Sequence, residues 1–158
     1  MKKTGKFIAM GLLVSVLLTG CGQDPKMVAF KNEIDNFCTQ ISEADTSINS
    51  IDAQSEGAAK ELLEYLDELD MDFRHFAEID FPEEFDYLES IADESSSYMT
   101  EAVRNYHEAY GGDSYNEAAA QYAKENYSRA YKRVQIIITF LHGEEPESVD
   151  LSTGAEEN

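Results

Sequence analysis

Carboxylate, imidazole and thiol groups are the side chains of this sequence that could bind a metal or attack a substrate. A carboxylate-bridged di-iron site in a helical bundle needs Glu-x-x-His on two helices, with all ligands pointing inward. The sequence contains no Glu-x-x-His, and its nearest pattern, Asp72-x-x-His75, occurs once. The other two histidines, His107 and His142, have no acid three positions earlier. We therefore predict no metal site and no cofactor.

Nucleophilic catalysis finds no better support. No Gly-x-Ser-x-Gly elbow is present, and the three histidines belong to different predicted helices. Cys38 has no histidine or base near it, so we interpret it as a small, mostly buried hydrophobic residue. Paired carboxylates are too common in this chain to single out an acid–base pair. We predict that the protein is not an enzyme.

Cys21 is the cysteine with a distinctive setting. The chain begins with Lys2, Lys3 and Lys6 and no acid, followed by the apolar run Phe7–Leu18. That run has 12 residues, well short of the ~20 that span a bilayer as a helix. A basic start, a short apolar core and a small-residue exit are the parts of a secretory signal peptide.

The exit, Leu18-Thr19-Gly20-Cys21, resembles the lipobox of bacterial lipoproteins. The resemblance covers only the first 21 residues. It implies cleavage between Gly20 and Cys21, thioether lipidation of Cys21 with fatty acyl chains such as palmitate, and a mature protein on the extracytoplasmic side of the cell membrane.

The charge balance limits the partners. The chain has 32 acids and 12 bases, for a net charge of −20, which becomes −23 once the three signal lysines are removed. Nucleic-acid binding is disfavoured because no basic stripe could displace counterions from phosphates. Lying flat on anionic lipid is disfavoured as well, so the membrane contact should be the lipid on Cys21.

Apolar residues at alternating spacings of three and four predict four helices. The first runs over about 25–53 and the second over about 58–78. The third opens at Pro82 and ends at Gly111, and the fourth follows a capping box of Ser114 and Glu117 and ends before Gly143. The segment Ile136–Phe140 has strand propensity, but it continues the helical pattern and has no strand to pair with.

These elements predict an all-α fold, an antiparallel four-helix bundle. The alternative is a three-helix bundle in which the second and third helices form one kinked helix. We divide the chain into a lipoprotein signal peptide (1–20), a lipidated tether (21–26), the helical bundle (27–143) and a disordered acidic tail (144–158).

Two residue sets could form an interaction surface. Tyr106 and Tyr110 on the third helix, and Tyr127 and Tyr131 on the fourth, are spaced by four residues. The simpler interpretation is that their rings pack at the interface of these helices while their hydroxyls meet water. The alternative is an aromatic contact surface for a partner protein or glycan.

The fourth helix also gathers four bases within ten residues: Lys124, Arg129, Lys132 and Arg133. Residues 113–143 carry a net charge of +1, whereas the other three helical segments are acidic. We favour the interpretation that these bases form exposed pairs that relieve acidic repulsion. The alternative is a basic patch, including Arg129 and Arg133, that an anionic partner recognises.

The function predicted from these features is a non-catalytic interaction or structural protein of the cell envelope, with an envelope protein as its partner. The alternative is a small-molecule or ion-binding lipoprotein that serves a transporter. A polar pocket between the third and fourth helices would favour the alternative, and a filled interface there would favour the first.

Overall fold

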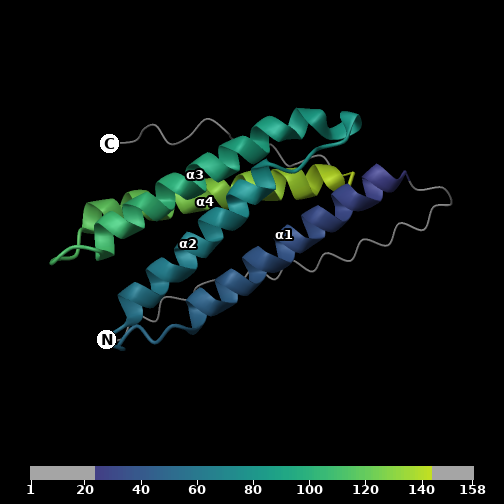
Figure 1. Cartoon of the computed structure of the whole chain (residues 1–158). Helices are drawn as coiled ribbons and strands as arrows, with labels where there is room; N and C mark the ends of the chain where they lie inside the picture. Colours follow the sequence, from purple (N-terminus) through teal and green to yellow (C-terminus); the bar gives the residue numbers. More distant parts are fainter. Residues whose placement is uncertain (1–23, 144–158) are drawn as a thin grey trace.

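The fold is an antiparallel bundle of four α-helices in up-down-up-down order (Figure 1). The structure is a computed structural model, and it describes residues 24–143. The helices are α1 (Pro25–Ser50), α2 (Ala58–Ala77), α3 (Glu89–Tyr110) and α4 (Glu117–Leu141), and a 3-10 helix, η1 (Glu83–Leu88), precedes α3. The all-α prediction is confirmed. Both predicted terminal segments, the signal peptide and the acidic tail, lie outside the described residues.

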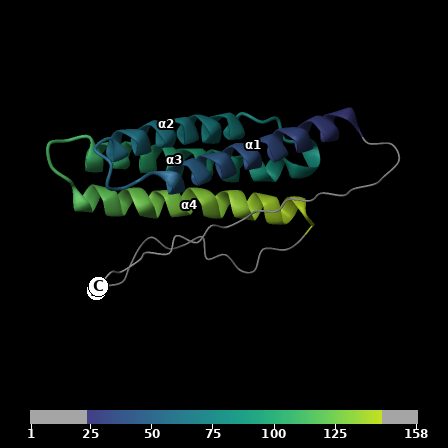
Figure 2. The same cartoon turned by 90° about the horizontal axis from the view of Figure 1, so that it is seen from below.

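Four helices rather than three make up the bundle. Helices α2 and α3 pack side by side and run in opposite directions (Figure 2), so they are not one kinked helix. Phe81, whose proline neighbour disfavours the α region, is non-helical, and its ring is buried. Pro82 is the N-cap of η1, and the α-helix begins only at Glu89, which corrects the prediction of an α-helix from Pro82.

The start of α1 follows its local chemistry. The Asp24 carboxylate accepts a hydrogen bond from the Lys26 amide at 3.0 Å, and Pro25 occupies the first helical position. Pro25 and Lys26, which the domain division placed in the tether, are thus already helical.

The predicted capping box of α4 is wrong. The N-cap is Asn116, whose side chain accepts from the Ala119 amide at 3.1 Å, and Ser114 lies in the preceding loop. The backbone amide of Asn116 also donates to the Ala109 carbonyl at 3.0 Å. This bond to the end of α3 fixes Asn116 at the turn into α4.

Two glycines end helices for different reasons. Gly143, which follows α4, has a φ of 74°, in the left-handed region that glycine accepts readily. Gly111 has a φ of −84°, so it does not form a left-handed cap. A Cβ at Gly111 would instead lie 2.6 Å from the His107 carbonyl oxygen, so close backbone approach is what requires glycine.

Two kinds of packing build the core. Large rings join α1 to α2 and to the segment before α3: Phe37 stacks on Phe76 at 4.1 Å between centroids, and Phe30 lies 5.0 Å from Phe81. Small side chains fill the interface of α3 with α4, and the fully or almost fully buried ones are Ala92, Ser95, Ala102, Ala109, Ala120, Ala123 and Ala130. Ile136, Ile137 and Ile138, which have strand propensity, are helical as predicted and deeply buried.

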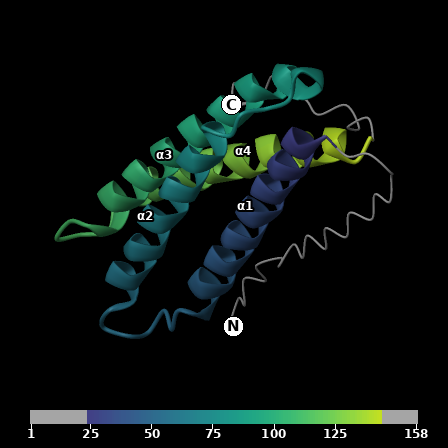
Figure 3. The same cartoon turned by 45° about the vertical axis from the view of Figure 1, so that its right-hand side comes forward.

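Helix α3 packs most extensively against α4 and next against α2, while α1 packs mainly against α2. The α1–α2 and α3–α4 loops lie at the same end of the bundle and diverge from each other (Figure 3). The start of α1, η1 and the end of α4 lie together at the opposite end.

Candidate functional site

Tyr127 and Tyr131 point toward α1 and bind one carboxylate. Their hydroxyl oxygens lie 2.7 and 2.9 Å from Asp45 Oδ1, and 3.1 Å from each other. The rings stack at 4.8 Å, and Tyr131 also lies 5.6 Å from Phe73 of α2. Since each hydroxyl has one proton, both can donate to Asp45 only if the contact between the two hydroxyls is not itself a hydrogen bond.

This tyrosine–aspartate network (Asp45, Tyr127 and Tyr131) is partly buried, so it serves the interior rather than a wet rim. Burial is the main cause that raises the pKa of both tyrosines, and the charge of Asp45 adds to it. The hydroxyls thus stay protonated and act as donors. The network links α1 to α4, which otherwise pack mainly on other helices.

The two arginines of the predicted basic patch differ. Arg133 is 7% exposed, donates from Nε to Glu94 Oε2 at 3.1 Å and lies 4.8 Å from the Tyr98 ring centre. Arg133 thus pairs with an acid of α3, in line with the interpretation that we favoured. The pair is not exposed as expected, however, because the Arg133 side chain is buried. Arg129 is half-buried, lies 5.7 Å from the same ring and donates to the Asn126 side-chain oxygen.

Tyr106 and Tyr110 lie at the α3–α4 loop. Their rings are 6.3 Å apart, and Tyr110 lies 5.3 Å from Tyr115 in the loop. Burial raises the pKa of Tyr106 to about 12. Tyr115 and Tyr122, which we had not singled out, are 57% and 62% exposed. The structure therefore splits the four predicted tyrosines into an interior pair and a pair whose ring contacts continue to the exposed Tyr115.

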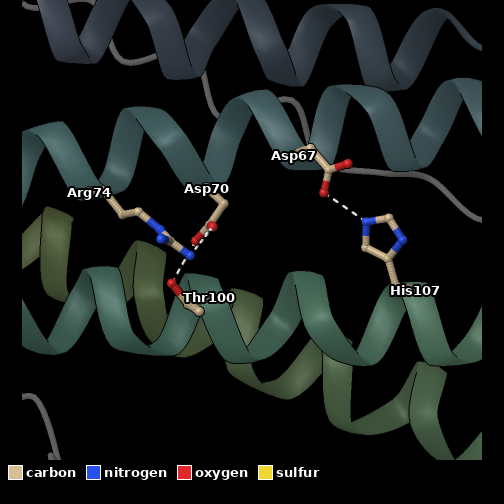
Figure 4. A network of polar contacts seen from close by, with 5 residues as sticks. All are labelled: Asp67, Asp70, Arg74, Thr100 and His107. Carbon is tan, nitrogen blue, oxygen red and sulfur yellow. Dashed lines mark hydrogen bonds and ion pairs between the residues drawn. The ribbon is translucent and has the colours of Figure 1, made fainter.

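A polar contact layer between α2 and α3 was missed by sequence reasoning (Figure 4). Asp70 accepts from the Thr100 hydroxyl at 2.6 Å and pairs with Arg74 at 2.7 Å, while Asp67 lies 2.7 Å from His107 Nε2. Most acids of α2 are exposed, yet the Asp70 side chain is only 13% exposed. The i,i+4 spacing of Asp70 and Arg74 was the signal available in the sequence.

The groups that could do chemistry do not converge. His75 lies in the last turn of α2, His107 in that of α3 and His142 just after α4. Within residues 24–143, no group of three or more histidine, cysteine or acidic side chains could hold a metal ion. Cys38 is half-buried, and burial raises the pKa of its thiol to about 11, so the thiolate is scarce at neutral pH.

A shallow groove of about 410 Å³ runs between α1 and α2. Its lining side chains are mostly polar: Gln40, Glu43, Ala44, Ser47, Tyr65, Glu68, Met71, Asp72 and His75. Burial raises the pKa of Asp72, an effect that His75 partly offsets and Glu68 reinforces. The groove lies on a different pair of helices from the one on which a ligand pocket was considered.

Gly20 and Cys21, the predicted cleavage and lipidation site, lie outside the described residues. No helix in the part of the chain that the structure describes is long and apolar enough to cross a membrane. Comparisons with protein-family models, with curated proteins and with solved structures found no match to this chain.

Proposed function

We propose that the protein is a lipoprotein held on the extracytoplasmic side of the cell membrane through Cys21, where it has a non-catalytic interaction or structural role. The anchor rests on the lipobox resemblance of Leu18-Thr19-Gly20-Cys21 and the signal-like segment before it.

The observation that carries the non-catalytic role is how the interior polar groups are used. The tyrosine–aspartate network and the Arg133–Glu94 pair bind one another across helices. No buried side-chain nitrogen or oxygen of the described residues lacks a hydrogen-bond partner. Small side chains also fill the α3–α4 interface, the outcome that favoured an interaction protein over a ligand-binding one. These groups therefore support the bundle rather than converge on a substrate.

The anchor also gives the bundle a direction. Cys21 precedes Asp24 by three residues, so its lipid would lie within about 11 Å of the start of α1. That end carries the exposed acids Asp80, Glu83, Glu84, Asp86 and Glu89, which anionic lipid headgroups would repel. The bundle would stand off the surface with its two loops pointing away from the membrane.

Cell fractionation with a labelled fatty acid tests the anchor. Cys21→Ala should abolish label uptake and release the protein from membranes, or leave it unprocessed. Cys38→Ala is the matched control, because it removes the chain's other thiol and should still take up label. A Cys21→Ala protein that keeps both the label and the membrane association would contradict the proposal.

The α1–α2 groove favours a second candidate, a ligand- or ion-binding lipoprotein that serves a transporter. Its volume falls in the range of small-ligand sites, about 300–1,000 Å³. Its three carboxylates would select a cationic ligand. Calorimetry with organic cations would support this candidate if Glu68→Gln weakened binding more than Glu61→Gln, which changes an exposed acid outside the groove.

A further inference from the structure

The end of the bundle formed by residues 105–123, called here the tyrosine tip, concentrates exposed aromatic surface. It carries four of the nine tyrosines of the chain, Tyr106, Tyr110, Tyr115 and Tyr122. Tyr115 and Tyr122 are more than half exposed. Large rings left in water at one end of a well-packed domain are typical of a contact surface, where tyrosine is enriched.

The tip is held in place. Tyr110 packs against a small apolar cluster of Ala109, Ala119 and Ala120 that is separate from the main core, and its ring contacts both Tyr106 and Tyr115. The loop is pinned where the Asn116 side chain donates to Glu108 Oε1 at 3.2 Å. Preorganised rings lose little side-chain entropy on binding, which favours a docking role.

The tip is also one-sided in charge. Residues 105–123 include the acids Glu108, Asp113 and Glu117 and no lysine or arginine. Two bases border this range: Arg104 is paired with Glu101 and also attracts Glu108 one turn later, and exposed Lys124 follows on α4. His107, within the range, contacts Asp67 of α2. Among the described residues, Asp113 and Glu117 form no ion pair, so their carboxylates remain open to a cationic partner.

We propose that the tyrosine tip docks a lysine- or arginine-rich segment of a partner protein, which deepens and rests on the interaction role proposed above. Guanidinium and ammonium groups stack on tyrosine faces and pair with carboxylates, so one cationic segment satisfies both features of the tip. The acidic charge of the whole chain would speed the approach of such a partner and repel anionic ones. In an anchored protein the tip lies at the far end from Cys21, about 33 Å away along α3, where a partner can reach it.

Binding of a short fluorescent peptide of alternating arginine and glycine to the purified full-length protein in detergent tests this docking. Tyr115→Ser combined with Tyr122→Ser should weaken binding roughly tenfold, since exposed cation–π contacts contribute about 0.5–1 kcal/mol each. Tyr87→Ser, at the opposite end of the bundle and 52% exposed, should change it less than about twofold.

A second pair of variants separates local from overall charge. Glu108→Gln with Glu117→Gln should weaken binding several-fold more than Glu83→Gln with Glu84→Gln, although both pairs remove the same charge. Thermal melts of all variants, whose changed side chains are exposed, check that each one folds.

Equal losses of peptide affinity in the tip variants and in the control variants would overturn the proposal, because the peptide would then respond to the overall charge of the protein. Absence of peptide binding would overturn it too, as would tip-dependent binding of a neutral oligosaccharide in place of the peptide. Lipidation plays no part in this assay. Absence of peptide binding would therefore reject the tip as a docking surface without affecting the proposed anchor. Failed fatty-acid labelling would reject the anchor without affecting the tip.

Discussion

Asp45→Ala should destabilise the bundle more than its partial exposure suggests. The substitution removes the one carboxylate oxygen that accepts from both Tyr127 and Tyr131, at 2.7 and 2.9 Å. A hydrogen bond to a charged group contributes about 1.5–3 kcal/mol net, so two such bonds are lost. The two hydroxyls already lie 3.1 Å apart and can pair with each other, which restores about 0.5–1.5 kcal/mol. We expect a net cost of about 1.5–5.5 kcal/mol in the free energy of unfolding.

Chemical denaturation of the purified protein, followed by circular dichroism, measures this cost. Asp35→Ala is the control, because Asp35 is an exposed acid of the same helix and its loss should change stability by less than about 0.5 kcal/mol. In a background of Tyr127→Phe and Tyr131→Phe, Asp45→Ala should cost far less, because the donors are gone. A cost that is the same in both backgrounds, or no greater than that of Asp35→Ala, would refute the idea that this network joins α1 to α4.

Three other predictions follow from burial and charge. Phe37→Ala should lower the unfolding free energy by about 3–5 kcal/mol and Ile137→Ala by about 2–5 kcal/mol in denaturant titrations, while Val28→Ala, at a 36% exposed position, should have little effect. Asp72→Asn should raise the melting temperature at neutral pH and not in acid. Burial raises the pKa of Asp72 in the folded state. Its contribution to stability is therefore complete below the unfolded-state pKa of about 3.9 and is lost as pH rises through the folded-state pKa. Equal melting shifts at both pH values would contradict this prediction. Burial raises the pKa of the Cys38 thiol to about 11, so this thiol should react with iodoacetamide far more slowly in the folded protein than in urea at about pH 8. Equal reaction rates in the two conditions would contradict the burial of Cys38.

Helix positions could be predicted from the sequence because the burial of a helix face is encoded locally. Phe30, Ile34, Phe37 and Ile41 repeat at spacings of three and four, and all four are buried on one side of α1. The same pattern correctly predicted that Ile137 lies in a helix, α4, although isoleucine favours strands. A continuous apolar face and breaks at glycine or proline are enough to place such helices.

The pairing between helices was not predictable in the same way. Asp45 and Tyr127 are 82 residues apart, and Glu94 and Arg133 are 39 apart. The pattern shows which face is buried, but not how far each helix is rotated about its axis. That rotation decides which flanking polar residues meet, so Tyr127 was expected at a wet rim and Arg133 in an exposed pair.

Local rules also failed where a tertiary bond chose between equivalent candidates. Ser114 and Asn116 are both good N-caps, and the bond from the Asn116 amide to the Ala109 carbonyl favours the second. The same loop brings Tyr115 against Tyr110, a contact that the spacing of tyrosines within a single helix could not indicate.

The intact mass of the protein purified from bacterial membranes tests whether Cys21 carries a lipid anchor. The mature chain should begin at Cys21, with residues 1–20 absent and the mass of a diacylglyceryl group on the N-terminal residue. Fragmentation should place that added mass on Cys21 and leave Cys38 unmodified. A membrane-associated chain that retains Met1, or that begins at another residue without lipid, would contradict the proposed anchor.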